Sequence, residues 1–401
     1  MLKPATAARQ LVGIELATAL RDCRSRTWAL VNDLTAAQWL PPSQCGVNPV
    51  AWELGHLAWF AEFWILRGPH SRGTDGLANA VRPPRFAGPD SLFDSARLVH
   101  AARWTDAMPS RNELEALLSQ QLEACIAAIP DSNGCDSDES LYFHRLSLFH
   151  EDMHGEAFCW LRSALGYPAP VGCGLSDLVD QISLPLLIRG GDVFLGYDTN
   201  THGFTFDNER PSCPVTLQDF EIDSVPISFA EFSRFVDAGG YDKPLYWPGQ
   251  AGAWRAQSGV SHPQRWQRNA AGEWQMRWFD QWVPLPLNSP AIHVNAFESE
   301  AWCLWAGRRL PSAAQWEQAA LSNPALTWGR SVWEWTADAF APYPGFKPGP
   351  YQEYSEPWFG DHRELRGGAI ATHQRMHNPR YRNFFQPHRS DIFAGFRTVS
   401  V

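Results

Sequence analysis

The spacing of apolar residues changes near Gly166, and this change constrains the fold of the 401-residue chain more than any other feature. Before it, apolar residues recur every three or four positions, which predicts amphipathic helices. The predicted helical segments are 8–33, 49–67, 112–129 and 138–166. Helices of this number and length predict a four-helix bundle, and the long connection at 68–111 is expected to cover one of its ends.

The pattern beyond Gly166 is that of a different kind of domain. A stretch bearing proline and glycine marks the predicted linker, 171–183. Short β-type runs, short helical segments and long loops dense in aromatic residues follow. The β-type runs are 184–197 and 213–228, and the helical segments are 229–240 and 298–310. We therefore predict an α+β protein of two domains, a helical bundle at 1–170 and an irregular α+β domain at 184–401.

Composition and charge restrict the function. A net charge of -10 argues against a nucleic-acid partner or an anionic membrane surface, which leaves small molecules as the expected partners. We find no run of about 18 apolar residues, so no membrane span is expected. Glu15 and Arg21 interrupt the apolar N-terminal pattern, unlike a signal peptide. The eight cysteines form no C-x-x-C pair and are expected to be reduced thiols of a cytoplasmic protein.

His150 and His154 are the most informative candidates for chemistry. Four residues apart on a predicted helix, they project from one face and can share a metal ion. The stretch reads H-E-x-x-H, the zinc-protease pattern, but after Glu156 no glutamate occurs before Glu209 to serve as a nearby third ligand. His56, on an apolar helix upstream, is an alternative third ligand if the helices pack together. Taken alone, His56 is more typical of a hydrogen-bonded core residue, and i, i+4 spacing also arises by chance.

Several segments of the second half resemble the formylglycine-generating-enzyme-like, C-type-lectin-like domain, and the preceding bundle resembles a DinB-type domain. The segments are 206–209, 290–320, 332–340, 365–373 and 381–397. Together the two domains resemble the non-heme iron sulfoxide synthases of ergothioneine biosynthesis. Formylglycine generation itself is disfavoured, because that chemistry needs a reactive cysteine pair late in the domain and the last cysteine is Cys303. The resemblance implies that the second domain lines the substrate pocket.

In that family an H-x-x-x-H-x-E helix and a histidine from an earlier helix bind Fe(II). The resemblance therefore implies that His56, His150 and His154 bind Fe(II), with positions left for O2, the imidazole of hercynine and a chalcogen donor. It also implies that Glu156 orients a ligand imidazole, although a surface carboxylate is the alternative interpretation.

Departures from the family pattern concern the residues that are expected to contact the chalcogen donor. The family motif R-N-W-D-x-P-x-R has an aspartate where this chain has Phe385, the glutamine before the second helix histidine is Met153, and residues 89–104 differ. Phenylalanine disfavours an ammonium group and favours an uncharged ring such as a sugar. The chain most resembles the selenoneine synthase branch of the family, particularly at 94–104, which implies Fe(II)- and O2-dependent carbon–selenium bond formation between hercynine and a selenosugar.

Three alternatives stay open. The first is an ergothioneine-type enzyme that uses γ-glutamylcysteine or cysteine. The second, from another class, is a non-catalytic sugar-binding module with a structural metal. A zinc hydrolase is the third.

Further site residues follow from the resemblance or from their position. The predicted substrate-binding residues are Met153, Arg82, Arg85, Asn383, Phe384, Phe385 and Arg389, and Arg103 is a further candidate for polar contact with the donor. A structural loop network is the alternative for the residues of the motif, and solvated side chains are the alternative for the arginines. One tyrosine is expected to supply a proton or an electron, and the candidates are Tyr343, Tyr351 and Tyr354.

Overall fold

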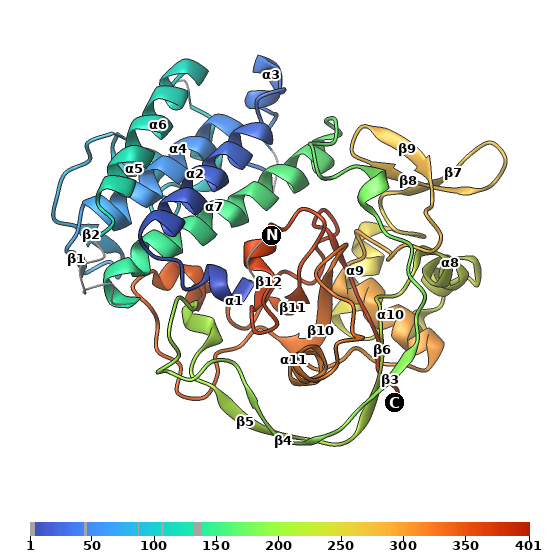
Figure 1. Ribbon diagram of the computed structural model, residues 1–401. Coiled ribbons are helices and arrows are strands. Elements are labelled where there is room, and N and C mark those ends of the chain that lie inside the picture. The colour runs from blue at the N-terminus through green and yellow to red at the C-terminus, as the bar shows by residue number, and fades with distance from the viewer. Residues whose placement is uncertain (1–4, 44–45, 87, 106–107, 131–137) are drawn as a thin grey trace. The chain divides into compact units, whose positions relative to one another are not determined.

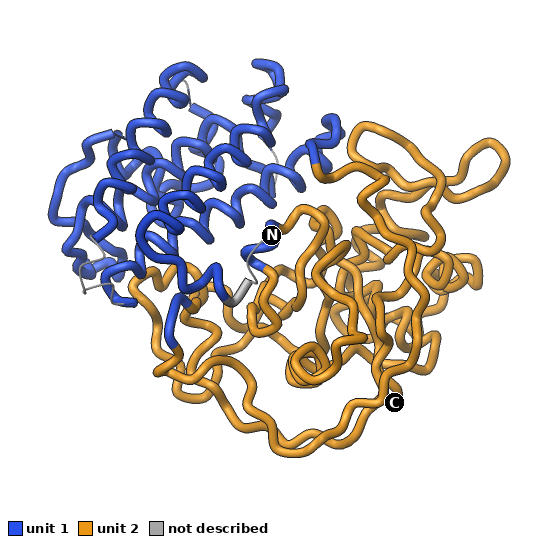
Figure 2. Tube along the Cα trace, viewed as in Figure 1, with its two compact units in different colours: residues 1–171, 202–204, 373–376 blue, residues 172–201, 205–372, 377–401 orange. Residues whose placement is uncertain are grey.

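The computed structural model describes residues 5–43, 46–86, 88–105, 108–130 and 138–401, and it forms two compact units (Figure 1, Figure 2). The first unit comprises Met1–Val171 with two short later segments, His202–Phe204 and His373–Met376. The second unit comprises the rest of the chain. The predicted two-domain α+β fold is confirmed. In the part of the chain that the structure describes, no helix is both long and apolar enough for a membrane span.

Four long helices build the first unit (Figure 1): α2 (Gly13–Ala29), α4 (Val50–Ala61), α6 (Arg111–Ala127) and α7 (Asp138–Leu165). Both α2 and α4 pack against both α6 and α7, which makes the arrangement of a four-helix bundle. One part of its core is a cluster of buried residues: Leu11, Leu16, Ala19, Leu20, Cys23, Leu122, Leu141 and Leu148.

The six cysteines that the structure describes are all free thiols, whereas Cys45 and Cys135 lie outside the described residues.

Helix boundaries follow local chemistry. Helix α6 begins after a capping box in which Ser110 and Glu113 bond each other's backbone N–H groups. The segment predicted as one helix at 8–33 is divided, since α1 (Ala5–Ala8) ends before Gly13, whose positive φ of 45° starts a new helix. Helix α4 continues into a π-helical turn, η1 (Glu62–Leu66), a feature that is frequent at functional sites. Helix α3 (Ala36–Trp39) is a single turn.

The long connection between α4 and α6 is folded against α4. It contains the hairpin β1 (His70–Arg72) and β2 (Ala78–Ala80), the helix α5 (Asp90–Phe93) and the 3-10 turn η2 (His100–Arg103). Asp90 accepts hydrogen bonds from Trp59 Nε1 at 2.8 Å and from Arg67 Nη2 at 3.0 Å. These bonds hold α5 beside α4.

Segment His373–Met376 joins the first unit through Arg375. The Nε and Nη2 atoms of Arg375 donate to the two carboxylate oxygens of Asp152 at 2.9 and 3.0 Å. Asp152 is almost fully buried on α7 and also accepts from the thiol of Cys23 at 3.3 Å. A buried carboxylate needs such partners because an unpaired charge is costly in the interior.

Short strands and helices build the second unit (Figure 1). A four-stranded sheet has the order β12 (Asn383–Phe385), β11 (Arg363–Gly367), β10 (Trp333–Ala339), β13 (Ala394–Gly395). Its first three strands are antiparallel neighbours, with Leu365 opposite Trp335 and Asn383, while β13 runs parallel to β10. The remaining strands are β3 (Pro185–Ile188) paired with β6 (Phe220–Asp223), β4 (Gly191–Leu195) paired with β5 (Cys213–Leu217), and the meander β7 (Trp266–Arg268), β8 (Trp274–Trp278), β9 (Gln281–Pro284).

Four helices of the second unit are α8 (Phe229–Asp237), α9 (Gln250–Ser258), α10 (Ala296–Ala306) and α11 (Ala313–Ser322). Strands β3 to β6 and helix α8 lie in the segments predicted for them, and helix α10 overlaps its predicted segment but begins before it, at Ala296. The region predicted as long aromatic loops contains the meander β7–β9 and helices α9 and α11 as well. These elements escaped the sequence pattern because strands such as Trp266–Arg268 are too short to show an alternation of apolar and polar residues.

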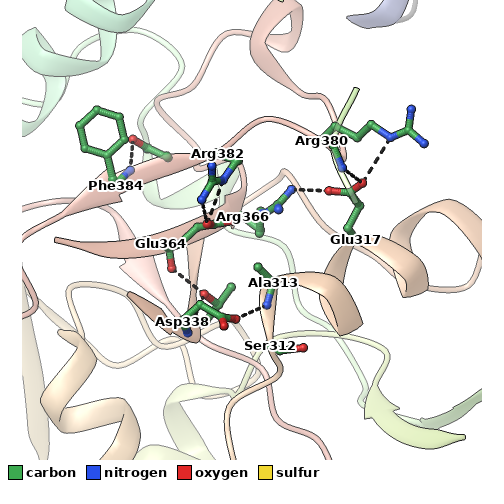
Figure 3. Close-up of polar contacts among 12 residues, drawn as sticks. Ser312, Ala313, Glu317, Asp338, Glu364, Arg366, Arg380, Arg382 and Phe384 are labelled. Atoms are coloured by element: carbon green, nitrogen blue, oxygen red, sulfur yellow. Dashed lines mark hydrogen bonds and ion pairs between the residues drawn. The ribbon is translucent and has the colours of Figure 1, made fainter. Parts of the chain in front are cut away.

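A buried ion network fixes the sheet of the second unit (Figure 3). Glu364 accepts from Arg366 Nε at 2.7 Å and from Arg382 Nε and Nη2 at 2.9 and 2.7 Å. Arg366 also donates to Glu317 at 2.8 Å, and Glu317 accepts from Arg380 at 3.3 Å. Glu364, Arg366 and Arg382 are at most 2 % exposed, so every charge has its partners inside the fold.

Candidate metal centre

Helices α4 and α7 pack together and bring the three predicted histidines into one cluster. One ring nitrogen from each of His56, His150 and His154 lies within 4.8 Å of the others. The ring centroids are 4.5 to 5.1 Å apart. His56 and His150 are only 2 % and 4 % exposed. The condition on which the three-histidine prediction depended, the contact of the two helices, is therefore met in the structure.

The Nδ1 atoms of two of these rings are already engaged. His56 Nδ1 lies 2.7 Å from the carbonyl oxygen of Phe93, and His154 Nδ1 bonds the carboxylate of Glu53. Because a carbonyl and a carboxylate only accept, both Nδ1 atoms carry the proton and donate. In the neutral form of each ring, the lone pair is then on Nε2. This is how metal-binding histidines are held in proteins, with one nitrogen for the metal and the other hydrogen-bonded.

Burial keeps the imidazoles of His56 and His150 in the neutral form that binds metals. Burial, and after it the charge of His154, lowers the pKa of His56 to about 3. The same two effects hold the pKa of His150 well below its ordinary value. Burial opposes the ionisation of Glu53, but the charge and hydrogen bond of His154 outweigh it and lower the pKa of Glu53 to about 2. Two of the imidazoles, His56 and His150, are thus neutral, and a buried carboxylate completes the cluster.

Aromatic side chains enclose the cluster. The ring of His150 stacks on Phe60 at 3.6 Å and an angle of 4°. The ring of His56 stacks with Trp52 at 5.0 Å and with Trp59 at 5.8 Å. These contacts fix the ring planes and exclude water from one side of the cluster. Three imidazoles in such a setting suit a divalent transition metal such as iron, copper, nickel or zinc, so the residues present fit the predicted ion.

Glu53 was not among the predicted site residues. The available signal was a carboxylate three residues before His56 on an otherwise apolar helix, where every residue from Val50 to Ala61 is buried. Glu156, for which the resemblance implies an orienting role, is buried on α7. The carboxylate that accepts a hydrogen bond from His154 is that of Glu53, and an orienting role of Glu156 stays a prediction.

The other candidates of the first unit lie on α7 or along the connection between α4 and α6. Met153, which stands between His150 and His154 in the sequence, is half-buried. Arg82 donates to the carbonyl of Leu66 at 3.1 Å, and the guanidinium of Arg85 lies over the ring of Phe86 at 4.8 Å. These contacts anchor the connection, and the substrate roles of the three residues stay predictions.

The candidates on strand β12 and just after it make local contacts. Asn383 accepts from the N–H of Phe384 at 2.9 Å, and the Phe384 ring stacks on Phe340 at 4.1 Å. The guanidinium of Arg389 lies over Phe385 at 5.3 Å and donates to both oxygens of Asp391 at 2.5 and 2.6 Å.

Two of the three candidate tyrosines are buried in the second unit. The hydroxyl of Tyr343 accepts from Arg366 at 3.2 Å, and the hydroxyls of Tyr354 and Tyr381 share a hydrogen bond of 3.0 Å. Burial raises the pKa of both Tyr343 and Tyr354 above the ordinary value. Tyr351 is half-buried. A role for any of them as proton or electron donor stays a prediction.

The fold and the cluster define a class of protein: a DinB-type bundle with a three-histidine cluster, followed by a formylglycine-generating-enzyme-like domain. Family models agree, since the DinB superfamily matches residues 19–156 and the sulfatase-modifying factor enzyme 1-like domain matches 178–331 and 327–401. The chain belongs to the family of the hercynine oxygenases and is an oxygenase.

Individual relatives support this assignment. The hercynine oxygenase of Mycolicibacterium smegmatis is 30 % identical over 444 residues, which cover 97 % of this chain and 98 % of the relative. That of Mycobacterium tuberculosis is 30 % identical over 96 % of this chain and 98 % of the relative. The formylglycine-generating enzyme of Streptomyces coelicolor is 25 % identical over 50 % of this chain. Membership of an oxygenase family removes the non-catalytic sugar-binding alternative.

Proposed function

We propose that this oxygenase binds Fe(II) through His56, His150 and His154 and joins the imidazole ring of hercynine to a chalcogen donor. The observation that carries the proposal is the cluster of three imidazoles, of which His56 and His150 are buried and neutral, in a chain similar over nearly its whole length to hercynine oxygenases. Bound iron would supply the redox chemistry with O2 and open positions for the substrates.

The reaction balances with O2 as the oxidant. The C–H bond of the imidazole carbon between the two ring nitrogens and the S–H bond of the donor break, and a C–S bond forms. One oxygen atom ends on the sulfur as a sulfoxide, and the other leaves as water with the two hydrogens. The same balance holds for a selenol donor and a selenoxide product.

The residues of this chain prepare the site for that reaction. Glu53 and the Phe93 carbonyl hold His154 and His56 in the Nδ1–H form, so that each presents Nε2. Phe60 and Trp52 fix the ring planes of His150 and His56 and keep water away from their faces.

The first candidate for the donor is a thiol, γ-glutamylcysteine or cysteine, as in an ergothioneine-type enzyme. The near full-length similarity to hercynine oxygenases supports it.

A selenosugar is the second candidate, favoured by the segment after β12. Phe385 stands where the family motif has an aspartate, and the nearby Asp391 is engaged in a bidentate pair with Arg389. An amino-acid donor would find no uncommitted carboxylate in this segment for its ammonium group, whereas an uncharged sugar needs none.

A competition assay tests both the proposed reaction of hercynine and the identity of the chalcogen donor. The protein is loaded anaerobically with Fe(II) and hercynine, and γ-glutamylcysteine, cysteine, a selenosugar and a thiosugar are then offered together with O2. We expect oxygen uptake that depends on hercynine, and mass spectrometry identifies the coupled product. Absence of hercynine-dependent uptake would contradict the function, and the dominant product decides between the donors.

A variant sharpens the choice of donor. If the uncharged side chain of Phe385 favours a selenosugar, Phe385→Asp is expected to shift the product ratio toward the amino-acid thiols by about tenfold, roughly the effect of one charge-assisted hydrogen bond. Phe385→Leu is the matched control, since it removes the ring without adding charge. A product ratio that is the same in both variants would contradict a role of this position in donor choice.

A further inference from the structure

We infer that residues 90–103, here called the anchoring segment, orient the histidine cluster, and that Glu53 is the positioning residue through which they act on His154. The inference rests on the proposed function, because it takes the three histidines to be metal ligands. It assigns to this segment a second role, separate from any contact with the chalcogen donor.

The first arm of the anchoring segment reaches His56. Helix α5 ends at Phe93, and its last carbonyl groups have no partner within so short a helix. Two side chains of α4 fill this need, since Trp52 Nε1 donates to the Leu92 carbonyl at 2.9 Å and His56 Nδ1 bonds the Phe93 carbonyl at 2.7 Å. The direction of the His56 ring therefore depends on the position of α5.

Gly55 permits this approach. The Phe93 ring packs so closely on α4 that a Cβ added at Gly55 would lie 2.1 Å from its Cε1 atom. Any other residue at this position would push Phe93 away from the helix. The close contact thus places the carbonyl of Phe93 within reach of His56.

The second arm reaches His154 through Glu53. One carboxylate oxygen of Glu53 bonds His154 Nδ1, and the other accepts from Asn48 Nδ2 at 2.6 Å. Asn48 in turn accepts from Arg103 Nη1 at 2.7 Å, at the end of the anchoring segment. Both oxygens of Glu53 are thereby occupied, which fixes the plane of its carboxylate.

Arg103 joins the two arms. Its guanidinium lies 4.1 Å over the ring of Trp52, which itself stacks on His56. Among the residues that the structure describes, no carboxylate forms an ion pair with Arg103, so Asn48 is its polar partner. A continuous set of contacts therefore runs from His154 to His56 by way of Arg103. Sequence changes in the anchoring segment would alter the orientation of both rings.

The decisive variant is Glu53→Gln, which keeps the volume of the side chain. A glutamine has one oxygen for two donors, Asn48 Nδ2 and His154 Nδ1–H, so one donor faces an NH2 group. Full-length metal-free protein is titrated anaerobically with Fe(II), without hercynine. We expect the dissociation constant to rise about 10- to 100-fold, the usual effect of removing such a partner of a ligand histidine.

Glu62→Gln is the matched control. Glu62 is also buried and also accepts through both oxygens, but from the backbone N–H groups of Arg85 and Phe86 rather than from a cluster histidine. This variant is expected to keep the Fe(II) affinity of the unaltered protein. Equal affinities of Glu53→Gln and Glu62→Gln would overturn the inference.

Two further readouts distinguish positioning from a general loss of stability. In the Glu53→Gln background, Asn48→Asp replaces the amide donor at position 48 with a carboxylate, which can accept from the NH2 group introduced at position 53. The oxygen at position 53 is then left for His154, and we expect part of the Fe(II) affinity to return. In ¹⁵N spectra of the metal-free protein, Glu53→Gln should reduce the Nδ1–H form of His154 and leave that of His56 unchanged. An unchanged His154 signal together with unchanged affinity would also overturn the inference. Because these measurements omit hercynine, their failure is separate from a failure of hercynine-dependent oxygen uptake.

Gly55→Ala tests the first arm. The added methyl group displaces Phe93 and its carbonyl, so we expect Fe(II) affinity to fall by about 10- to 100-fold. Phe93→Val in the same chain removes the clashing ring and is expected to recover affinity. A Gly55→Ala protein that binds Fe(II) as tightly as the unaltered protein would show that the Phe93 contact does not position His56.

Discussion

His150→Ala is expected to lose bound iron and to lower hercynine-dependent turnover by at least about 100-fold. Losing a ligand should cost more than losing a hydrogen-bonded partner of a ligand, which typically costs 10- to 100-fold. The structure adds a second reason, because the His150 ring packs flat on Phe60 and its removal admits water beside the other two histidines. Iron content after anaerobic loading and the rate of oxygen uptake with hercynine measure the effect.

His144→Ala is the matched control for this experiment. His144 lies on the same helix α7, is also buried, and bonds the carbonyl of Cys125 at 3.1 Å outside the cluster. Both alanine variants leave a similar cavity, so a shared loss of stability is expected in both. Iron content should fall only in His150→Ala. A folded His150→Ala protein with full iron content and turnover would refute the three-histidine site.

Glu364→Gln is expected to lower the free energy of unfolding by about 3–5 kcal/mol, the usual cost of removing one partner of a buried ion pair. Arg366 and Arg382 both donate to this carboxylate, and neither guanidinium has access to water (Figure 3). Denaturant titration followed by tryptophan fluorescence measures the loss. Asp219→Asn, which breaks the exposed pair with Arg189, should produce little measurable change. Equal losses in the two variants would contradict a special role of the buried network.

The ionisation of Glu364 also makes the stability of the protein depend on pH. Burial would raise the pKa of Glu364, but Arg382 and Arg366 outweigh it and lower that pKa below the ordinary value. Stability from this charge is therefore present above the ordinary pKa of a glutamate and is lost as the pH falls through the lowered pKa. The difference in unfolding free energy between the unaltered protein and Glu364→Gln should shrink in acid.

The sequence predicted the helices of the first unit better than the short strands of the second unit, and the reason is physical. Helices of several turns repeat the same pattern, so the apolar helix α4, the helix α7 and the positions of their histidines were visible in the chain itself. The strands β7 to β9 are three to five residues long, and one or two pleats do not separate a strand from a loop. Their positions depend on packing with residues distant in sequence.

Within the candidate site, the residue types and their spacing identified His150 and His154 as a pair and His56 as an alternative third ligand, and the resemblance to a family implied that the three act together. The sequence alone therefore predicted that imidazoles are the metal-binding groups and which helices carry them. Glu53, Asn48 and the Phe93 carbonyl became visible only in the tertiary structure. A backbone carbonyl has no signature in a sequence, and a carboxylate acquires its partner only when two helices pack face to face. Packing decided which nitrogen of the His56 and His154 rings faces a hydrogen-bond partner and which is left for the predicted metal.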